Sequence, residues 1–95
     1  MAIRETNTHD GSGESAETWA LHALAWVLSE PGRAERFVAL TGICPEDLRA
    51  RAGDPAVLDA VLAFLEGHEP DLFACAKYLG LAPIELITAR QRLSR

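Results

Sequence analysis

Four glycines in this chain are each followed by a proline two or three residues later. The four pairs are Gly42–Pro45, Gly53–Pro55, Gly67–Pro70 and Gly80–Pro83. Glycine is common just past the end of a helix because it adopts left-handed backbone conformations. Proline is common at the first helical position because its φ is fixed near the helical value. The spacing therefore predicts a series of short helices that meet at these four points.

Apolar residues recur with helical spacing between the glycine–proline pairs, and no stretch alternates with a period of two. The pattern predicts an all-α fold, a compact bundle of five to six short helices. The helices are expected at residues 16–28, 31–41, 45–52, 55–66, 70–79 and 83–93. Ser15 and Asp54 are suitable N-caps for two of them, and Cys44 occupies a third N-cap position.

The first helix, residues 16–28, is expected to form the centre of the core. Between residues 19 and 28 every residue except His22 is apolar, and a helix that is apolar nearly all round is normally buried on most of its faces. Trp19 and Trp26 are seven residues apart and lie on one stripe of this helix. The two tryptophans are among the large apolar side chains from which a contact patch at the surface is expected.

Residues 1–14 show no helical periodicity and are expected to form a disordered arm, which leaves residues 15–95 as a single helical domain. The start of the chain is polar and has no signal-peptide pattern, and no apolar stretch is long enough to span a bilayer. With Cys44 and Cys75 as the chain's two cysteines, we expect a cytoplasmic protein with reduced thiols and no membrane association.

The chain is acidic, with a net charge of −5. An acidic domain repels the phosphate backbone, so nucleic-acid binding is not expected. It stays open as an alternative because the second and third helices have helix-turn-helix spacing, and three C-terminal arginines could contact phosphates. These arginines are Arg90, Arg92 and Arg95. Against this alternative, Glu46 and Asp47 would point negative charge at DNA from the start of the third helix.

The heptapeptide at residues 42–48 recurs at residues 80–86 with the pattern G-[IL]-x-P-x-[DE]-L. Such a recurrence is compatible with two similar helical triplets in tandem. Helix capping alone demands a glycine, a proline and a carboxylate at these positions, so capping is the preferred explanation. Duplication stays open as an alternative.

No residue pattern identifies a catalytic, cofactor or metal site. His22 has no carboxylate or cysteine three or four residues away, and His68 lies between two acids in a predicted loop. Cys44 precedes two acids that favour the protonated thiol, while Cys75 fits a core position. Neither cysteine belongs to a CxxC motif, and the known nucleotide, hydrolase and zinc motifs are absent. We expect no enzyme, since a site at His22 or Cys44 would need a concave pocket around one of them.

Several stretches combine these apolar residues and helix ends. They are LAWVL at 24–28, RFVALTG at 36–42, PEDLR at 45–49, GDP at 53–55 and VLAFL at 61–65. In them the chain resembles a family of short alphaproteobacterial proteins that is catalogued only as a domain of unknown function. The similarity covers about residues 16–93. It implies a compact, cytoplasmic, bacterial helical domain with no assigned activity and no catalytic residue to carry over.

The leading functional hypothesis is a small protein-interaction domain without catalysis. A domain of about 80 residues has little interior, because the buried fraction of a chain falls with its size. Some of its large apolar side chains should therefore reach the surface and form a contact patch for a protein partner.

Overall fold

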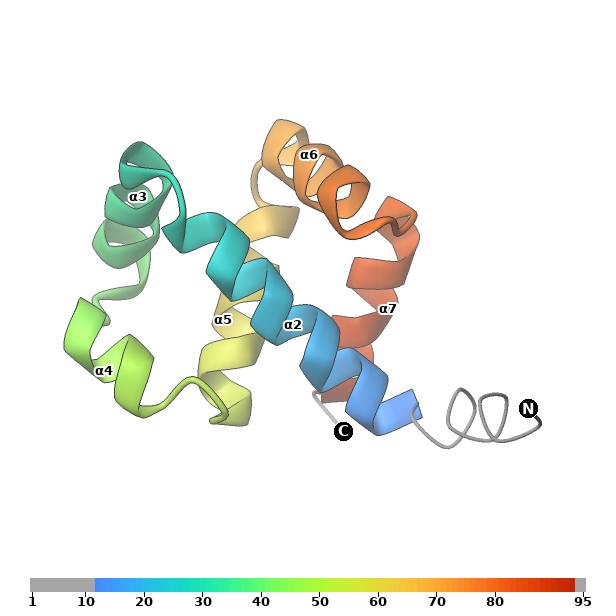
Figure 1. Cartoon of the computed structure of the whole chain (residues 1–95), viewed down its shortest axis with the longest axis horizontal. Helices are drawn as coiled ribbons and strands as arrows, with labels where there is room; N and C mark the ends of the chain where they lie inside the picture. The colour runs from blue at the N-terminus through green and yellow to red at the C-terminus, as the bar shows by residue number, and fades with distance from the viewer. Residues whose placement is uncertain (1–11, 94–95) are drawn as a thin grey trace.

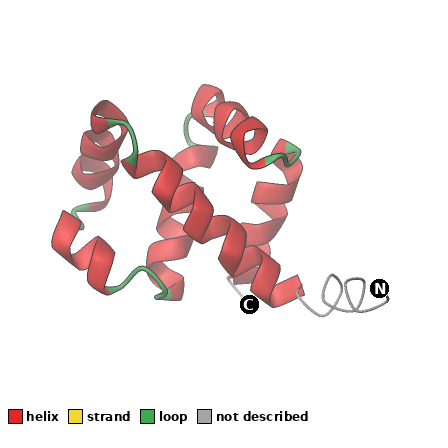
Figure 2. Cartoon of the chain, viewed as in Figure 1, coloured by secondary structure: helices red, strands yellow, loops and turns green. Residues whose placement is uncertain are grey.

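The computed structural model describes residues 12–93 of the chain, with side chains from residue 16 onward. Within this range there are six α-helices and no strand (Figure 1, Figure 2). The helices are α2 (Ser12–Leu28), α3 (Pro31–Thr41), α4 (Pro45–Ala50), α5 (Pro55–Glu66), α6 (Glu69–Leu79) and α7 (Pro83–Leu93). The expected all-α bundle is confirmed.

Three of the four glycines follow a helix directly, and two of them need glycine's freedom. Gly42 ends α3 and Gly80 ends α6, each with φ of 76°, in the left-handed region where a side chain would be strained. Gly67 ends α5 with an ordinary right-handed φ of −78°. The boundaries of α3 and α5 are those expected, and α6 begins one residue earlier, at Glu69.

α4 is shorter than expected because the residues after Ala50 form the turn that leads into α5. It ends at Ala50, and Arg51 rather than Gly53 forms its C-cap. The N–H of Asp54 then donates to the carbonyl oxygen of Arg51 at 2.9 Å. This turn places the Asp54 carboxylate at the N-terminus of α5, where it accepts from the N–H of Ala56 at 2.9 Å.

α2 begins at Ser12, four residues before the expected start. Residues 12–14, expected to belong to a disordered arm, are therefore helical, and Ser15 lies inside the helix rather than at its N-cap. Gly13 did not stop the helix, since a glycine in a helix costs only about 1 kcal/mol relative to alanine. The rest of the expected arm, residues 1–11, lies outside the described residues.

α2 lies at the centre of the fold, as expected, and crosses in front of α5 in Figure 1. It packs against α3, α5, α6 and α7. Its buried face consists mainly of small residues: Ala16, Ala20, Ala23, Leu24 and Val27. The expectation that most of its faces are buried is wrong, because its opposite side is exposed. Trp19 and Trp26 also pack against the core, and both are only partly buried.

α5 supplies the largest share of the core. Its buried residues are Val57, Leu58, Val61, Leu62, Phe64 and Leu65. The ring of Phe64 meets that of Phe37 from α3 edge to face, with centroids 5.3 Å apart and an interplanar angle of 84°. Leu48, Leu72, Cys75, Ala76, Leu86 and Ala89 complete the core from α4, α6 and α7. Among residues 16–93 no polar or charged residue is buried.

The two copies of the recurring heptapeptide are alike at their first and last residues but differ in hydrogen bonding, since the N–H of Ile43 donates to Oγ1 of Thr41 and the N–H of Leu81 to the carbonyl oxygen of Ala76. Leu48 and Leu86, which end the two copies, are both 1% exposed, and each copy starts with a left-handed glycine. The two helices that begin within the copies differ in length, because α4 has six residues and α7 has eleven. Capping accounts for the shared part, and the duplication of a whole triplet stays a prediction.

Among residues 12–93 no single helix is both long and apolar enough to cross a membrane. α6 and α7 meet that requirement only when taken together, as a pair bent by 96°.

We predict that Ala20→Leu destabilises the fold while Ala25→Leu does not. Ala20 is fully buried, so extra methyl groups there must push α2 away from its neighbours, at about 1–3 kcal/mol. Ala25 lies on the exposed side of the same helix and serves as the matched control. Urea denaturation measures both free energies of unfolding, and equal values for the two variants would contradict the orientation of α2.

The caps of α3 and α5 predict an acid-sensitive contribution to stability. Hydrogen bonds from the N–H groups of Arg33 and Gly32 lower the pKa of Glu30 below its ordinary 4.5. The N–H of Ala56 and the Arg51 guanidinium lower the pKa of Asp54 below 3.8. A carboxyl group whose pKa is lower in the folded protein than in the unfolded chain stabilises the fold at pH values above the unfolded-state pKa. This stabilisation is lost as the pH falls through the folded-state pKa.

The melting temperature of the Glu30→Gln/Asp54→Asn variant should therefore fall less steeply than that of the parent protein between pH 5 and pH 3, in the range around the two pKa values. Glu69→Gln is the control, because this exposed residue in the first turn of α6 has no such hydrogen bond. Parallel pH profiles for the parent and the double variant would contradict the role of the two caps.

Candidate functional site

α4 packs less closely on the domain than the other helices do. It is six residues long, and Leu48 is the single buried residue among them. The most extensive helix contacts join α2, α5 and α7, and α3 and α6 pack against this centre. Figure 1 shows α4 at the edge of the molecule, beyond α3 along the chain. The sequence PEDLRA has only one large apolar residue, so α4 cannot bury a continuous face.

An open groove of about 440 Å³ lies between α3 and α4. It is lined by Leu28, Ala34, Glu35, Val38, Ala39, Pro45 and Arg49. Five of these seven residues are apolar, and the two charged ones come from different helices. We call this feature the α3–α4 groove. Its lining offers an apolar surface with one carboxylate and one guanidinium, and no group of convergent polar atoms.

The corner between α2 and α3 positions the groove. The Arg33 guanidinium lies over the Trp26 ring, 3.6 Å from its centroid, and donates from Nη2 to the Trp26 carbonyl oxygen at 2.7 Å. The Glu30 carboxylate accepts from the Arg33 N–H at 2.7 Å and caps α3. These contacts provide hydrogen-bond partners for backbone groups at the C-terminal end of α2 and at the N-terminal end of α3. They fix the direction of α3 and therefore the position of one wall of the groove.

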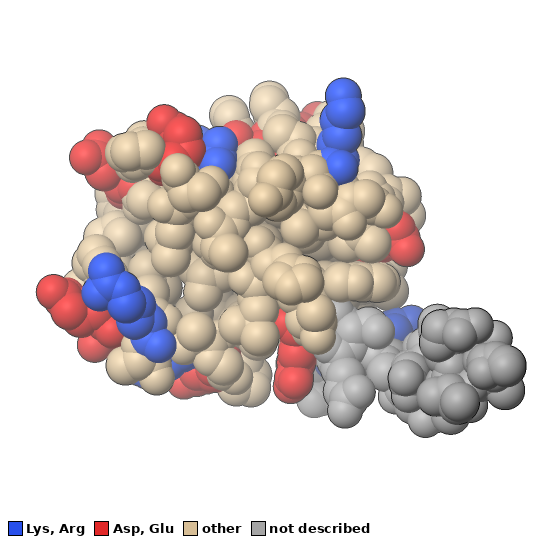
Figure 3. All heavy atoms as spheres, in the orientation of Figure 1, with Lys and Arg blue, Asp and Glu red and all other residues tan. Residues whose placement is uncertain are grey.

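Two further hollows lie on either side of the exposed face of α2. The α2–α4 hollow, about 240 Å³, is lined by Leu21, Leu24, Ala25, Leu28, Leu48, Arg49 and Ala52. The α2–α6 hollow, about 490 Å³, is lined by His22, Ala25, Trp26, Ser29, Tyr78 and Leu79. Ala25 borders both hollows. Figure 3 shows that the face over α2 is almost free of charged side chains, which gather at the edges of the view.

A fourth hollow, of about 530 Å³, lies between α3 and α5. Arg36 and His68 are part of its lining, and Phe64 contributes an aromatic ring. Arg36 is already engaged, because its Nη2 donates to Oδ2 of Asp71 at 2.8 Å. The Nε2 of His68 is 3.9 Å from the same carboxylate oxygen. This arrangement joins α3 to α6 and serves the fold.

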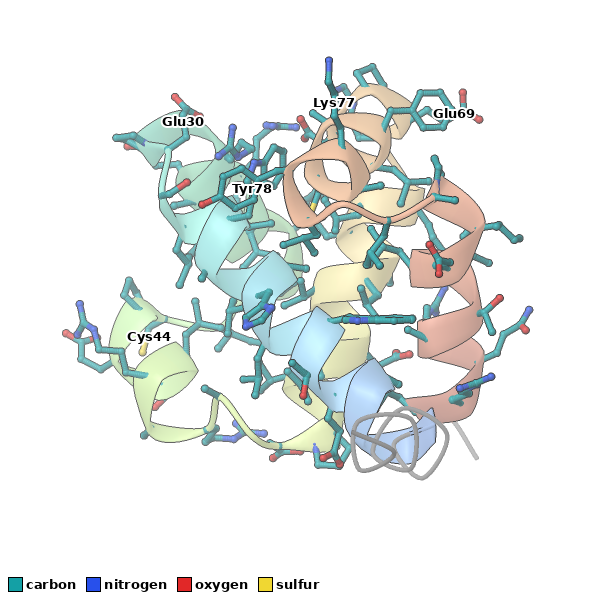
Figure 4. The ribbon with its side chains drawn as sticks, turned by 45° about the vertical axis from the view of Figure 1, so that its right-hand side comes forward. Glu30, Cys44, Glu69, Lys77 and Tyr78 are labelled. Atoms are coloured by element: carbon teal, nitrogen blue, oxygen red, sulfur yellow. The ribbon has the colours of Figure 1, made fainter. Side chains whose placement is uncertain are left out.

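His22, considered as a candidate catalytic residue, is exposed and lies in the α2–α6 hollow. A concave surface is therefore present at His22, but its lining includes no carboxylate to orient the imidazole. Ser29 Oγ donates to the Trp26 carbonyl oxygen at 2.7 Å and accepts from Arg33, so it is committed to the corner. Tyr78 extends from α6 toward the end of α2 in Figure 4.

The family model described as "Protein of unknown function (DUF3572)" matches residues 13–95. The chain belongs to this family. No curated protein and no solved structure matches the chain. Membership in the DUF3572 family agrees with the resemblance seen in the sequence, and the alphaproteobacterial origin stays a prediction. The family description assigns no activity, so the chemistry of the site must be read from its own residues.

The two cysteines of this DUF3572 chain lie in different settings. Cys44 is exposed at the N-cap of α4 and makes no capping hydrogen bond with its side chain. Cys75 is fully buried, and burial raises the pKa of its thiol to about 11. A buried, protonated thiol is inert. Across the described residues no three His, Cys, Asp or Glu side chains are grouped so that they could hold a metal ion.

Arg90, considered above as a phosphate contact, has a structural role. Its Nε donates to Oδ1 of Asp59 at 3.0 Å, and its Nη1 donates to Oε1 of Glu66 at 2.9 Å. These bonds, with Asp59 first, raise the pKa of Arg90. They tie α7 to two points of α5 that are about two turns apart. Arg92 also makes an interaction within the protein, and Arg95 lies outside the described residues.

We predict that Arg90→Ala lowers the free energy of unfolding by about 1 kcal/mol, because two partly exposed ion pairs are lost. Lys77→Ala, which removes an exposed charge from α6, is the control and should leave stability within about 0.5 kcal/mol of the parent. Chemical denaturation measures both effects. A stable Arg90→Ala variant that loses salt-dependent retention on DNA would instead assign Arg90 to phosphate binding.

Proposed function

We propose that this domain is a non-catalytic protein-interaction module, and that its α3–α4 groove receives the apolar face of a helix from a partner protein. The observation that carries the proposal is the apolar lining of the groove between two helices, one of which packs loosely. A loosely packed helix can adjust its position when a partner binds, because it gives up few contacts in doing so.

The groove favours a helical partner over other peptide conformations. A peptide that binds as an added strand needs an exposed sheet edge, and residues 12–93 contain no strand. Proline-rich peptides dock on aromatic-lined grooves, whereas the lining of the α3–α4 groove contains no aromatic ring. A helix needs only apolar contacts for side chains at i, i+3, i+4 and i+7, which Leu28, Val38 and Ala39 can provide.

Catalysis and nucleic-acid binding receive less support. A catalytic site needs several polar groups directed at one point, and the α3–α4 groove offers only Glu35 and Arg49. For nucleic acid, Arg90 is held by two carboxylates of α5, and exposed Glu46 and Asp47 occupy the first turn of α4. The proposed setting is the bacterial cytoplasm, in agreement with the two free cysteines.

Site-specific photocrosslinking tests the proposal. A photoreactive residue is placed at Ala39, in the groove, or at Ala74, an exposed alanine on α6 that serves as the matched control. In a bacterial extract the Ala39 probe should crosslink one protein through a helical segment with an apolar face, and the Ala74 probe should not.

Binding is then repeated with the purified partner and two variants of equal charge change. Ala39→Glu should abolish binding, because it places a carboxylate on the apolar surface, while Ala74→Glu should bind like the parent. Equal crosslinking from both positions, or a partner that still binds Ala39→Glu, would overturn the assignment of the groove.

A further inference from the structure

The α3–α4 groove and the α2–α4 hollow meet beside α4. Leu28 of α2 and Arg49 of α4 line both of them. On the far side of Leu28 the apolar lining continues with three more residues of α2, which are Leu21, Leu24 and Ala25. The two hollows therefore form one largely apolar surface that runs from α3 past the end of α2, and Arg49 lies where they join.

Arg49 differs from the other arginines that the structure describes. Each of the other five makes an interaction within the protein; they are Arg33, Arg36, Arg51, Arg90 and Arg92. Among residues 16–93 the exposed side chain of Arg49 makes no hydrogen bond, ion pair or ring contact. A guanidinium binds a carboxylate with two parallel hydrogen bonds, so the group that suits this position is a carboxylate from another molecule.

The opposite wall of the groove carries the opposite charge. Glu35 of α3 is exposed, and within the described part of the chain its carboxylate also has no hydrogen bond or ion pair. Glu35 and Arg49 are the two charged residues of the lining, so the α3 wall is acidic and the α4 wall is basic. A helix that lays its apolar face in a groove turns one flank toward each wall, and charges on such flanks determine partner choice and orientation.

We infer that the partner helix carries a carboxylate on the flank that faces Arg49 and an ammonium or guanidinium group on the flank that faces Glu35. The inference rests on the proposed function, because it names the chemistry of the partner for the same groove. Reversing the direction of a helix exchanges its two flanks, so only one direction brings each charge of the partner to its opposite. Glu35 and Arg49 thereby determine the direction in which the partner lies.

The same two charges disfavour other helices. A chain with a net charge of −5 attracts basic helices at long range. A helix with basic residues on both flanks would nevertheless bring a like charge to Arg49, and a helix with acids on both flanks would bring one to Glu35. Like charges that meet at an interface lower the affinity and reject wrong partners. The groove therefore selects a helix with one acidic and one basic flank.

A synthetic peptide with this pattern tests the inference. It has about 18 residues, which form a helix about 27 Å long, with leucines at i, i+3, i+4 and i+7. Glutamates occupy one flank, lysines occupy the other, and a nitroxide is attached to the N-terminus. In an NMR titration of the isotopically labelled protein, the peptide should shift the amide signals of Val38 and Ala39. The nitroxide should broaden signals at one end of the groove only.

Two charge reversals locate the pairing. Arg49→Glu should weaken peptide binding by about tenfold, because a repulsion replaces an attraction. Lys77→Glu is the matched control, since Lys77 points outward from α6 in Figure 4 and lines neither hollow. It makes the same change in charge and should alter the affinity by less than about twofold. The NMR spectra also show that each variant is folded.

The double variant Glu35→Arg/Arg49→Glu keeps the net charge and exchanges the two walls. It should bind the peptide like the parent, but in the reversed direction, so that the nitroxide broadens signals at the other end of the groove. An unchanged direction in the double variant would overturn the inference. So would a peptide that shifts no groove signal at about 1 mM, the upper end of weak affinities.

Ala39→Glu separates the two proposals. Peptide binding that is lost in Ala39→Glu but unchanged in Arg49→Glu would overturn the charge pattern and leave the groove assignment in place. Peptide binding that is unchanged in both variants would overturn the groove assignment as well.

Discussion

The close approach of α2 to α5 and α7 is the contact on which the other helices depend. Three alanines on the buried side of α2 leave room for the larger residues of its neighbours, and helix axes can approach to about 8 Å when the side chains between them are small. Alanine buries little apolar area, so the largest share of the hydrophobic stabilisation comes from the six buried residues of α5. α2 sets the spacing, and α5 supplies the apolar area.

The boundaries of α3, α5 and α7 were predictable from the sequence because capping is local, whereas the start of α2 and the end of α4 were not. Gly42 and Gly80 each end a helix through their own backbone conformation, and Asp54 caps α5 through a neighbour two residues away. The exposure of one side of α2 was not predictable in this way, because the sequence between residues 19 and 28 is apolar nearly all round the helix. Tryptophan is large and is seldom fully buried, and Trp26 instead supports the Arg33 guanidinium at the corner.

The ion pairs of Arg90 and the α3–α4 groove both follow from contacts between residues that are distant in the sequence. The partners of Arg90 lie 31 and 24 residues away, so its position near a basic C-terminus gave no indication of them. Asp59 and Glu66 are seven residues apart, and therefore on one stripe of α5, which was the available signal. The α3–α4 groove had a weaker signal in the single large apolar residue of α4. Its apolar walls come from three helices whose arrangement no local pattern determines.

α2 packs one side against its own domain and exposes Leu21 and Leu28 on the other, beside polar residues such as Glu17 and His22. A fully buried leucine contributes about 1.5–3 kcal/mol relative to an exposed one, and Leu21 and Leu28 realise only part of this within the monomer. The inward side combines three alanines with Leu24 and Val27, and the outward side carries Ala25 beside the two leucines. Because the inner side is held by α5 and α7, the outer side is presented in a fixed geometry. Association on a preorganised surface loses less conformational entropy than association on a mobile one, so the packing of the core also determines how readily this side of α2 can be covered.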